Sequence, residues 1–423
     1  MKNLFKVIMS FILAITLMFS VMGCSSGSSS NKNVVLNALF MKQAGYSVSD
    51  VTNMTNDFTK IHPNIKVNLT FVAYEELGPK ILTSAKSGGY DVVLGDCIWP
   101  AQFAQAGIVL DVTSRVKKLD LNDIYKGALD SIKYNGKYYG IPWLNDVMYL
   151  YYNKKILSEA GFSNPPKTWD ELMTQAKVIK DKGLLEYPMV SQWQQSDGLI
   201  CDYANYLGSF GGKFTDAKNN PTLTDPQNIK ALDFMYNMVK QGIENPKSLE
   251  FTCDDVFNTF ASENAAFALN WTYMFNGAQD TTKSKVANDI GIAPIPGTEG
   301  VVSATVNGGM PLMITSGSKH PDESWQYMLY LSSKDVQKKY IKSALPIWKS
   351  LYTDPEVINA AGKALVDASK IQYQYIINRP QVPYYNDLST YMQSEVQSVL
   401  LGKMSAESAL TAVQSKALII AKN

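Results

Sequence analysis

Four short stretches of the sequence place an aromatic ring beside acidic or amide side chains. They are "GDCIWP" (95–100), "IPWLND" (141–146), "SQWQQSD" (191–197) and "NWTYMF" (270–275), in a chain with 24 Tyr, 16 Phe and 7 Trp residues. Such rings can stack on the C–H faces of a sugar, while carboxylates and amides bond the hydroxyls on its rim. One aromatic side chain is more often plain core, so the indication comes from the four stretches together. They favour a site for a polyhydroxylated solute.

Motifs of the common catalytic and metal sites are absent from the sequence. His62 and His320 are each followed by proline, so neither a histidine metal site nor a Ser-His-Asp triad is supported. "GSFGGKF" (208–214) has the wrong spacing for a phosphate loop, and "GCSSG" (23–27) lies where no strand-turn-helix elbow can form. We expect no metal and no cofactor. A glycosidase needs only two carboxylates, and with 38 acidic residues that class stays an alternative.

The beginning of the chain is typical of an export signal. Lys2 and Lys6 precede the apolar run "VIMSFILAITLMFSVM", which ends just before Gly23. A short membrane anchor is the alternative, because the run approaches the length that spans a bilayer. "VMGC" (21–24) resembles the lipobox of bacterial lipoproteins, whose cysteine carries a diacylglycerol thioether and becomes the new N-terminus. We therefore expect a lipoprotein signal peptide at 1–23, lipidation of Cys24 and a flexible tether at 24–33.

Charge, length and cysteine content narrow the class of protein. The 39 basic and 38 acidic residues nearly balance, which argues against nucleic acid as the partner. About 390 residues follow the tether, enough for two domains. Cys97, Cys201 and Cys253 remain in the exported chain. Both a Cys201–Cys253 disulfide and three unpaired thiols are consistent with the sequence.

The period of the apolar residues predicts an α/β fold. Strands are expected at 34–40, at 65–71 and in "YDVVLG" (90–95), with helices near 48–61 and 75–87. This order is typical of a parallel sheet, which binds ligands at the carboxyl ends of its strands. The residues at those ends are Gln43, Tyr74 with Glu75, and Asp96 with Trp99.

Helical patterns dominate the second half of the chain. Thr168 is expected to cap a helix that Glu171 supports as capping-box partner and that ends at Gly183. Apolar stripes at 229–239 and 388–400 predict two further helices, and the last 90 residues or so read as mostly helical.

Six segments in order along the chain resemble one known family. Residues 134–179, "YNGKYYGIPWLNDVMYLYYNKKILSEAGFSNPPKTWDELMTQAKVI", are similar to the central segment of extracellular solute-binding proteins of carbohydrate ABC importers, in the maltose and trehalose branch of family 1. The other five segments are "YDVVLGDCIWPAQFAQAGIVLDVT", "VFNTFASENAAFALNWTYMF", "GIAPIPG", "VNGGMPLMITSGSKHPDESWQYMLYL" and "NRPQVPYY".

The resemblance implies a periplasmic-binding-protein-like fold, with two α/β lobes of discontinuous chain segments joined by a hinge. We expect an N-terminal lobe of 34–140 plus 296–333 and a C-terminal lobe of 141–295 plus 334–423. Crossings would fall near "YYGIPWLND", "GIAPIPG" and "SSKDVQKK".

Family positions carried onto matching residues complete the expected ligand site. Together with the aromatic stretches and the strand ends, they give the following ligand-binding residues: Gln43, Tyr74, Asp96, Trp99, Asp146, Trp193, Trp271, Tyr273, Gly309 and Arg379. Trp271 and Tyr273 would be the stacking platform, Gly309 a backbone donor and Arg379 a clamp on hydroxyls. The alternatives are a structural Asp146–Arg379 ion pair and Asp96 as a helix N-cap.

Two positions depart from the family pattern. Met310 stands where relatives often carry Trp, and Gln43 lies where some use Glu, so the sugar itself is left open.

The expected protein is a monomeric receptor without catalysis, lipid-anchored at the extracellular face of the cell membrane. It would close on a disaccharide or oligosaccharide and deliver it to the transmembrane subunits of an ABC permease. The alternatives are an exported glycoside hydrolase and a receptor for a peptide or polyamine.

Overall fold

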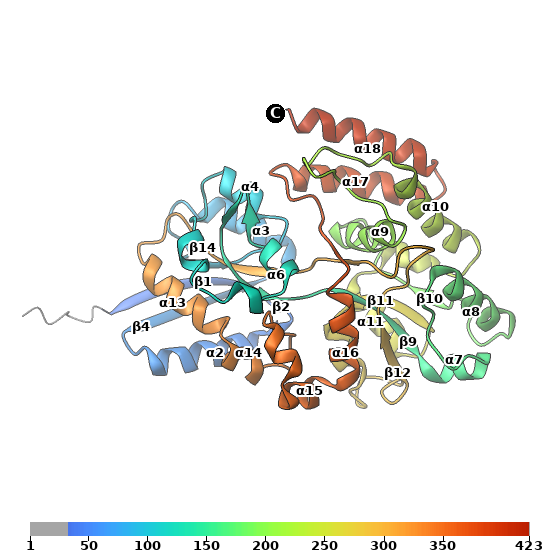
Figure 1. Cartoon of the computed structure of the whole chain (residues 1–423), viewed down its shortest axis with the longest axis horizontal. Helices are drawn as coiled ribbons and strands as arrows, with labels where there is room; N and C mark the ends of the chain where they lie inside the picture. Colours follow the sequence, from blue (N-terminus) through green and yellow to red (C-terminus); the bar gives the residue numbers. More distant parts are fainter. Residues whose placement is uncertain (1–32, 423) are drawn as a thin grey trace, which may run out of the picture.

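The computed structural model of the chain describes residues 33–422, which form two α/β lobes side by side (Figure 1). The two-lobed α/β architecture predicted from the sequence is thereby confirmed. The expected signal peptide, Cys24 and most of the tether lie outside the described residues. Within 33–422, no helix combines the length and the apolar character needed to cross a membrane.

The first lobe is built on a five-stranded sheet in the order β4-β1-β5-β14-β8. The predicted strands β1 (Val34–Met41), β4 (Ile65–Val72) and β5 (Val92–Leu94) are present and parallel. β14 (Met310–Ile314) returns antiparallel to β5 and also pairs with β8 (Ile141–Leu144). Its helices are α2 (Val48–Ile61), α3 (Tyr74–Ser84), α4 (Pro100–Gln105), α5 (Thr113–Val116), α6 (Lys126–Asp130), α13 (Pro321–Leu331) and α14 (Lys334–Lys339). Two small hairpins, β2 (Gln43–Ala44) with β3 (Tyr46–Ser47) and β6 (Lys133–Tyr134) with β7 (Lys137–Tyr138), complete it.

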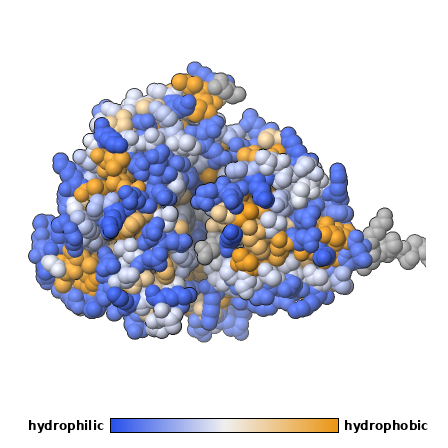
Figure 2. All heavy atoms as spheres, turned by 180° about the vertical axis from the view of Figure 1, so that it is seen from behind, coloured by the Kyte–Doolittle hydropathy of each residue, from blue (hydrophilic) through white to orange (hydrophobic). Residues whose placement is uncertain are grey.

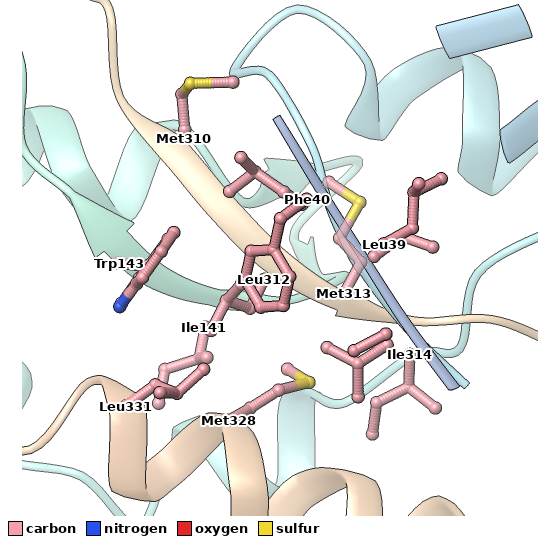
Figure 3. Packing of buried hydrophobic residues seen from close by; sticks show 14 of the residues in the cluster. Leu39, Phe40, Ile141, Trp143, Met310, Leu312, Met313, Ile314, Met328 and Leu331 are labelled. Carbon is pink, nitrogen blue, oxygen red and sulfur yellow. The ribbon is translucent and has the colours of Figure 1, made fainter. Parts of the chain in front are cut away.

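The core of this lobe joins segments that are far apart in the sequence (Figure 3). Phe40 of β1 and Trp143 of β8 are buried with ring centroids 5.5 Å apart. Leu312 of β14 lies beside them, and Met328 and Leu331 of α13 cover the same cluster. Because β8 contributes its side chains here, residues 141–144 are part of the first lobe.

The second lobe is built on a four-stranded sheet in the order β10-β11-β9-β12. β9 (Met148–Asn153) is antiparallel to both β11 (Phe267–Trp271) and β12 (Ile290–Ala293), and β10 (Met189–Val190) is parallel to β11. Its helices are α7 (Lys154–Ala160), α8 (Trp169–Asp181), α9 (Asp197–Ser209), α10 (Pro226–Lys240), α11 (Cys253–Ala261), α12 (Tyr273–Ala278), α15 (Pro355–Ala361), α16 (Lys363–Gln372), α17 (Tyr385–Leu400) and α18 (Ala406–Ile420).

The caps and stripes predicted for the helices of this lobe are present. Thr168 Oγ1 accepts the Glu171 amide at 3.1 Å and caps α8, although the Glu171 carboxylate bonds the amide of Lys167 rather than that of Thr168. The α17 stripe of Leu388, Met392, Val396 and Leu400 is buried.

Three segments of the chain pass between the lobes. The first follows β8 at 145–147, the second surrounds β13 (Thr305–Val306), and the third follows Tyr340 after α14. β13 pairs in parallel with β15 (Ile376–Ile377), so the chain before α17 also runs along this boundary.

The positions of these crossings change the expected lobe limits. "GIAPIPG" (291–297) is not a crossing, because β12 holds its start inside the second sheet and the Gly297 amide bonds the Lys167 carbonyl at 3.1 Å. α14 contributes Val336 to the core of the first lobe, so 334–339 do not belong to the second lobe. In place of the predicted limits we propose 34–144 plus 308–340 for the first lobe and 147–306 plus 345–422 for the second.

Two buried acids lie in the core of the second lobe. Glu244 accepts bonds from the hydroxyls of Ser191 at 3.0 Å and Ser248 at 2.6 Å. Asp202 accepts bonds from the amide of Gln192 at 3.2 Å and from its Nε2 at 3.1 Å. Burial raises the pKa of Glu244 to about 8 and that of Asp202 well above its usual range. The folded protein therefore keeps a proton on Glu244 that the unfolded chain releases near pH 4.5.

Glu244→Gln should flatten the pH dependence of stability. Between about pH 5 and about pH 8 the folded wild type binds more protons than the unfolded chain, so its stability falls as the pH rises. The amide can still accept one serine hydroxyl through Oε1 and donate to the other serine through Nε2, but it has no proton to lose, so the urea midpoint of the variant should fall less over this range. Glu250→Gln, an exposed change in the same lobe, should follow the wild type. Parallel curves for wild type and Glu244→Gln would contradict the assignment.

Candidate ligand-binding site

The candidate site lies where strand ends of both lobes meet the crossing segments. Asp96 follows β5 directly, Asp146 lies in the first crossing, and Trp271 ends β11. Arg379 follows β15 and Gly309 precedes β14. The expected position at the carboxyl ends of parallel strands therefore holds for Asp96, and the lobe boundary brings the other residues to it. A furrow marks this boundary on the surface (Figure 2).

Arg379 joins the two lobes through two carboxylates. Its Nη2 donates to Asp96 Oδ1 of the first lobe at 3.1 Å, and its Nη1 pairs with Asp197 Oδ2, in the first turn of α9 in the second lobe. The Arg379 side chain is 2% exposed. We call Asp96, Arg379 and Asp197 the interlobe clamp. Buried charges of this kind are stable only when paired and hydrogen-bonded, so the clamp depends on the lobes being close together.

Each carboxylate of the clamp is held by further donors. Asp96 accepts the Tyr74 hydroxyl at 2.9 Å and the Ile98 amide at 3.2 Å. Asp197 accepts the hydroxyls of Tyr385 at 2.7 Å and Ser389 at 2.5 Å, and its place at the start of α9 is favourable for a negative charge. Burial, followed by the adjacent carboxylates, raises the pKa of both tyrosines far above the usual range, so they remain donors.

Arg379 has further contacts in the same place. Its Nη2 lies 3.3 Å from Cys97 Sγ and 3.4 Å from the Asn307 carbonyl, while its Nε is buried without a partner among the described residues. Cys97 and Cys201 are buried and Cys253 is half-buried, and all three are free thiols. The Cys201–Cys253 disulfide left open by the sequence is not formed.

Asp146 also lies at the lobe boundary but is not part of the interlobe clamp. Its Oδ1 accepts the amides of Val147 at 3.0 Å and Thr272 at 3.3 Å, and it forms no ion pair with any described residue. Burial raises the pKa of Asp146 to about 6 against the lowering effect of these bonds. A cavity of about 10 Å³ beside it is lined by Gly45, Leu144, Asn145, Thr272, Tyr273, Ser343, Ala344 and Leu345. That volume suits a single water molecule, so any larger solute needs the lobes to separate.

The expected stacking residues of the second lobe are close to Asp146. Trp271 is half-buried, and its ring lies so near Gly308 that a Cβ there would be 2.3 Å from a ring carbon. The Gly308 amide in turn donates to the Asp146 carbonyl at 2.9 Å. The Tyr273 hydroxyl donates to the Cys253 carbonyl at 3.0 Å, which fixes its ring beside the cavity.

Three predicted ligand contacts of the first lobe are already engaged with protein. Tyr74 stacks on Trp99 with centroids 5.9 Å apart and an interplanar angle of 16°, and Trp99 is 5% exposed. In this arrangement Tyr74 and Trp99 support the clamp and the core. The Gly309 amide donates to Asn307 Oδ1 at 2.9 Å, so it serves the crossing rather than offering a free donor.

Trp193 is a core residue of the second lobe, which corrects the sequence prediction. It is fully buried, with Tyr206 edge-on at 6.4 Å. The ring faces inward because the stretch 191–193 follows β10 into the lobe, where Gln192 bonds Asp202. Gln43 lies in β2, and its side chain is outside the described part of the structure.

Asp197 is the member of the interlobe clamp that the sequence prediction did not include. It belongs to the same stretch as Trp193, "SQWQQSD", in which the aromatic ring drew attention away from the acid. A local signal existed, since Ser196 caps α9 and an acid in the first helical turn points its carboxylate at the helix end. The alternative of an Asp146–Arg379 ion pair is wrong, because Arg379 pairs with Asp96 and Asp197 instead.

Within residues 33–422, no group of three or more His, Cys, Asp or Glu side chains is arranged to hold an ion. The arrangement can instead bind uncharged hydroxyls through Asp146 and bring two lobes together through Arg379.

Comparison with known proteins places this geometry in context. Residues 37–338 match the family described as bacterial extracellular solute-binding protein. A probable ABC transporter-binding protein of Deinococcus radiodurans is 28% identical over 345 residues, which cover 78% of this chain and 80% of that relative.

Solved structures resemble the chain over both lobes. Maltose-bound MalE3 of T. maritima has a TM-score of 0.82 and 26% identity, covering 92% of this chain and all of that one. A solute-binding protein of an ABC transporter from Agrobacterium radiobacter, in complex with ribitol, has a TM-score of 0.80 and 26% identity, covering 91% of this chain and 98% of that one.

Arg379→Met should open the lobes. Removing one partner of a buried ion pair costs roughly 3–5 kcal/mol when the remaining charges stay buried, and separation of the lobes lets Asp96 and Asp197 regain water. We expect a larger radius of gyration in small-angle X-ray scattering with little loss of helix by circular dichroism. Arg115→Met, at a surface pair with Asp322, is the matched control and should leave the radius unchanged. An unchanged radius for Arg379→Met would show that the clamp does not hold the lobes.

Proposed function

Because this chain belongs to the bacterial extracellular solute-binding proteins, we propose that it is the receptor of a carbohydrate ABC importer, which captures a sugar outside the cell and delivers it to the permease. The observation that carries this proposal is Asp146. Its carboxylate has no cationic partner among the described residues and lies in a small cavity at the lobe boundary. Tyr273 lines this cavity, and Trp271 directly precedes Thr272, whose amide bonds Asp146.

Such a site suits a neutral, hydroxyl-rich solute. Arg379 already compensates Asp96 and Asp197, so they offer little uncompensated charge to a cationic ligand such as a polyamine. Asp146 can accept hydroxyl hydrogens through charge-assisted bonds, and the aromatic rings can face the C–H surface of a sugar ring. A peptide or polyamine receptor is therefore the weaker alternative.

Closure of the lobes is the proposed working step. The cavity of about 10 Å³ admits a sugar only when the lobes move apart at the three crossings. A bound sugar would then contact residues of both lobes, which shifts the equilibrium towards the closed form. The closed form, held by the clamp, would be the one that docks on the transmembrane subunits of the permease.

We propose no chemical step for this chain. Hydrolysis of a glycosidic bond needs two carboxyl groups, one as acid and one as nucleophile or base. Asp96 and Asp197 share Arg379 and several hydroxyl donors, so their oxygens are already engaged, and Asp146 has no second free acid among the residues that line its cavity. Release of an intact sugar is the outcome that fits.

The test is calorimetric titration with malto-, trehalose-, cello-, xylo- and manno-type sugars, with the recovered ligand analysed for cleavage. One-to-one binding of an intact sugar supports the receptor. Cleaved ligand would show that the protein is a glycosidase, and absence of binding to every sugar of the panel would refute the carbohydrate assignment.

Asp146→Asn should weaken sugar binding and remove the loss of affinity that the wild type shows at acidic pH. In the wild type, affinity should fall as the pH drops below about 6, where Asp146 takes up a proton and loses its charge. A hydrogen bond to a charged group contributes roughly 1.5–3 kcal/mol, so we expect a loss of about ten- to a hundredfold in affinity at neutral pH. Titrations at several pH values measure both effects. Asp181→Asn, exposed on α8, is the control, and wild-type binding by Asp146→Asn would remove Asp146 from the site.

We propose that the receptor acts as a monomer anchored through a lipid on Cys24 at the extracellular face of the membrane. Cys24→Ser should abolish incorporation of labelled fatty acid and release the protein from washed membranes into the medium. Retention of Cys24→Ser in the membrane would favour the alternative, in which the apolar run before Gly23 is itself the anchor.

A further inference from the structure

Helix α9 connects the interlobe clamp to the hinge. Its first turn carries Asp197, which pairs with Arg379. Two turns later Asn205, fully buried, accepts the amide of Val306 in β13 through Oδ1 at 2.7 Å. β13 lies where the second lobe leads into the second crossing, and it pairs with β15, which precedes Arg379, so one helix contacts both the clamp and the strand from which that crossing begins.

The other crossing is tied to the same point. Asn205 Nδ2 lies 3.2 Å from Met148 Sδ, at the start of β9 just after the first crossing. Thr305 Oγ1 donates to the Met148 carbonyl at 2.9 Å and lies 3.0 Å from the Met148 amide. Two crossings are thus fastened to each other through Thr305 and to α9 through Asn205.

The contacts among Asn205, Met148 and Thr305 also extend to the candidate site. Met148 is the strand partner of Trp271 in the β9–β11 ladder. The C-terminal part of α9 also packs closely against the residue before β13, because a Cβ on Gly208 would lie 2.7 Å from Ala304 Cβ. A helix held this closely against β13 cannot rotate at one end without moving the other.

We propose that Asn205 is a positioning residue for lobe closure. It fixes the hinge strand β13 to α9, so that rotation at the crossings and engagement of Asp197 with Arg379 occur as one movement. This inference rests on the proposed receptor function and adds to it a residue that touches neither the sugar cavity nor the clamp.

The test compares three variants with the wild type, using the tightest-binding sugar of the panel. Asn205→Leu keeps the branched side-chain skeleton and removes the acceptor for the Val306 amide. Thr305→Val removes the hydroxyl that joins the crossings and keeps the β-branched shape, so it provides a second reading if Asn205→Leu folds poorly. Ser209→Ala is the matched control, because Ser209 is equally buried on α9 and its hydroxyl bonds only the Asn205 carbonyl within the helix.

If Asn205 couples the hinge to the clamp, its loss should impair sugar binding and lobe closure and not only lower the stability of the fold. We expect Asn205→Leu and Thr305→Val to bind at least tenfold more weakly and to lose most of the sugar-induced decrease in radius of gyration. Ser209→Ala should bind within about threefold of the wild type, whatever its urea midpoint. Wild-type affinity and compaction in both hinge variants, or an equal loss in Ser209→Ala, would overturn the inference. Absence of binding by the wild type would instead refute the receptor function itself.

Discussion

One guanidinium shared by two carboxylates of opposite lobes is the interaction on which the arrangement of this protein depends. The Arg379 side chain is almost inaccessible to water, and the side chains of Asp96 and Asp197 are 9% and 16% exposed. Such charges are tolerated only when they are paired and hydrogen-bonded, and Tyr74, Tyr385 and Ser389 provide further hydrogen bonds to the carboxylates. Separation of the lobes would break the bridge through Arg379 and expose its acids to water. The clamp therefore gives closure a definite end point, and it leaves Asp146 as the uncompensated acid at the boundary.

The fold places these groups with few degrees of freedom. Asp96 sits directly after a buried parallel strand, and Asp197 begins a buried helix, so both carboxylates are carried by rigid elements. Arg379 instead comes from the segment between β15 and α17, which runs along the boundary. Three segments connect the lobes, and at Gly308 in one of them a side chain would collide with the Trp271 ring. Rigid lobes and narrow crossings are what a receptor needs to convert binding of a small solute into one large movement.

Much of this architecture could be predicted from the sequence, because its signals are local. The alternation of apolar residues in 65–71 and the Thr168 cap each specify their element without reference to distant parts of the chain. The predictions failed where the position of a residue depends on packing against residues that are distant in the sequence. Trp193 was expected at the site, but the partners that bury it, such as Tyr206, come from another element of the lobe. Asp197 was missed because only the folded chain brings it within reach of Arg379, 182 residues away in sequence. The second crossing was misplaced because the strand pairing of β12, which local composition does not specify, keeps "GIAPIPG" in one lobe.

A double-mutant cycle between Asp96→Asn and Asp197→Asn, measured as sugar affinity, tests the central claim most directly. The two acids belong to different lobes and share Arg379 as their common partner, so the second substitution should cost much less than the first once the bridge is broken. We predict a coupling energy of at least about 1 kcal/mol, within the range found for residues of one ionic network. Additive effects, agreeing within about 0.3–0.5 kcal/mol, would mean that the carboxylates act independently and that the clamp does not drive closure.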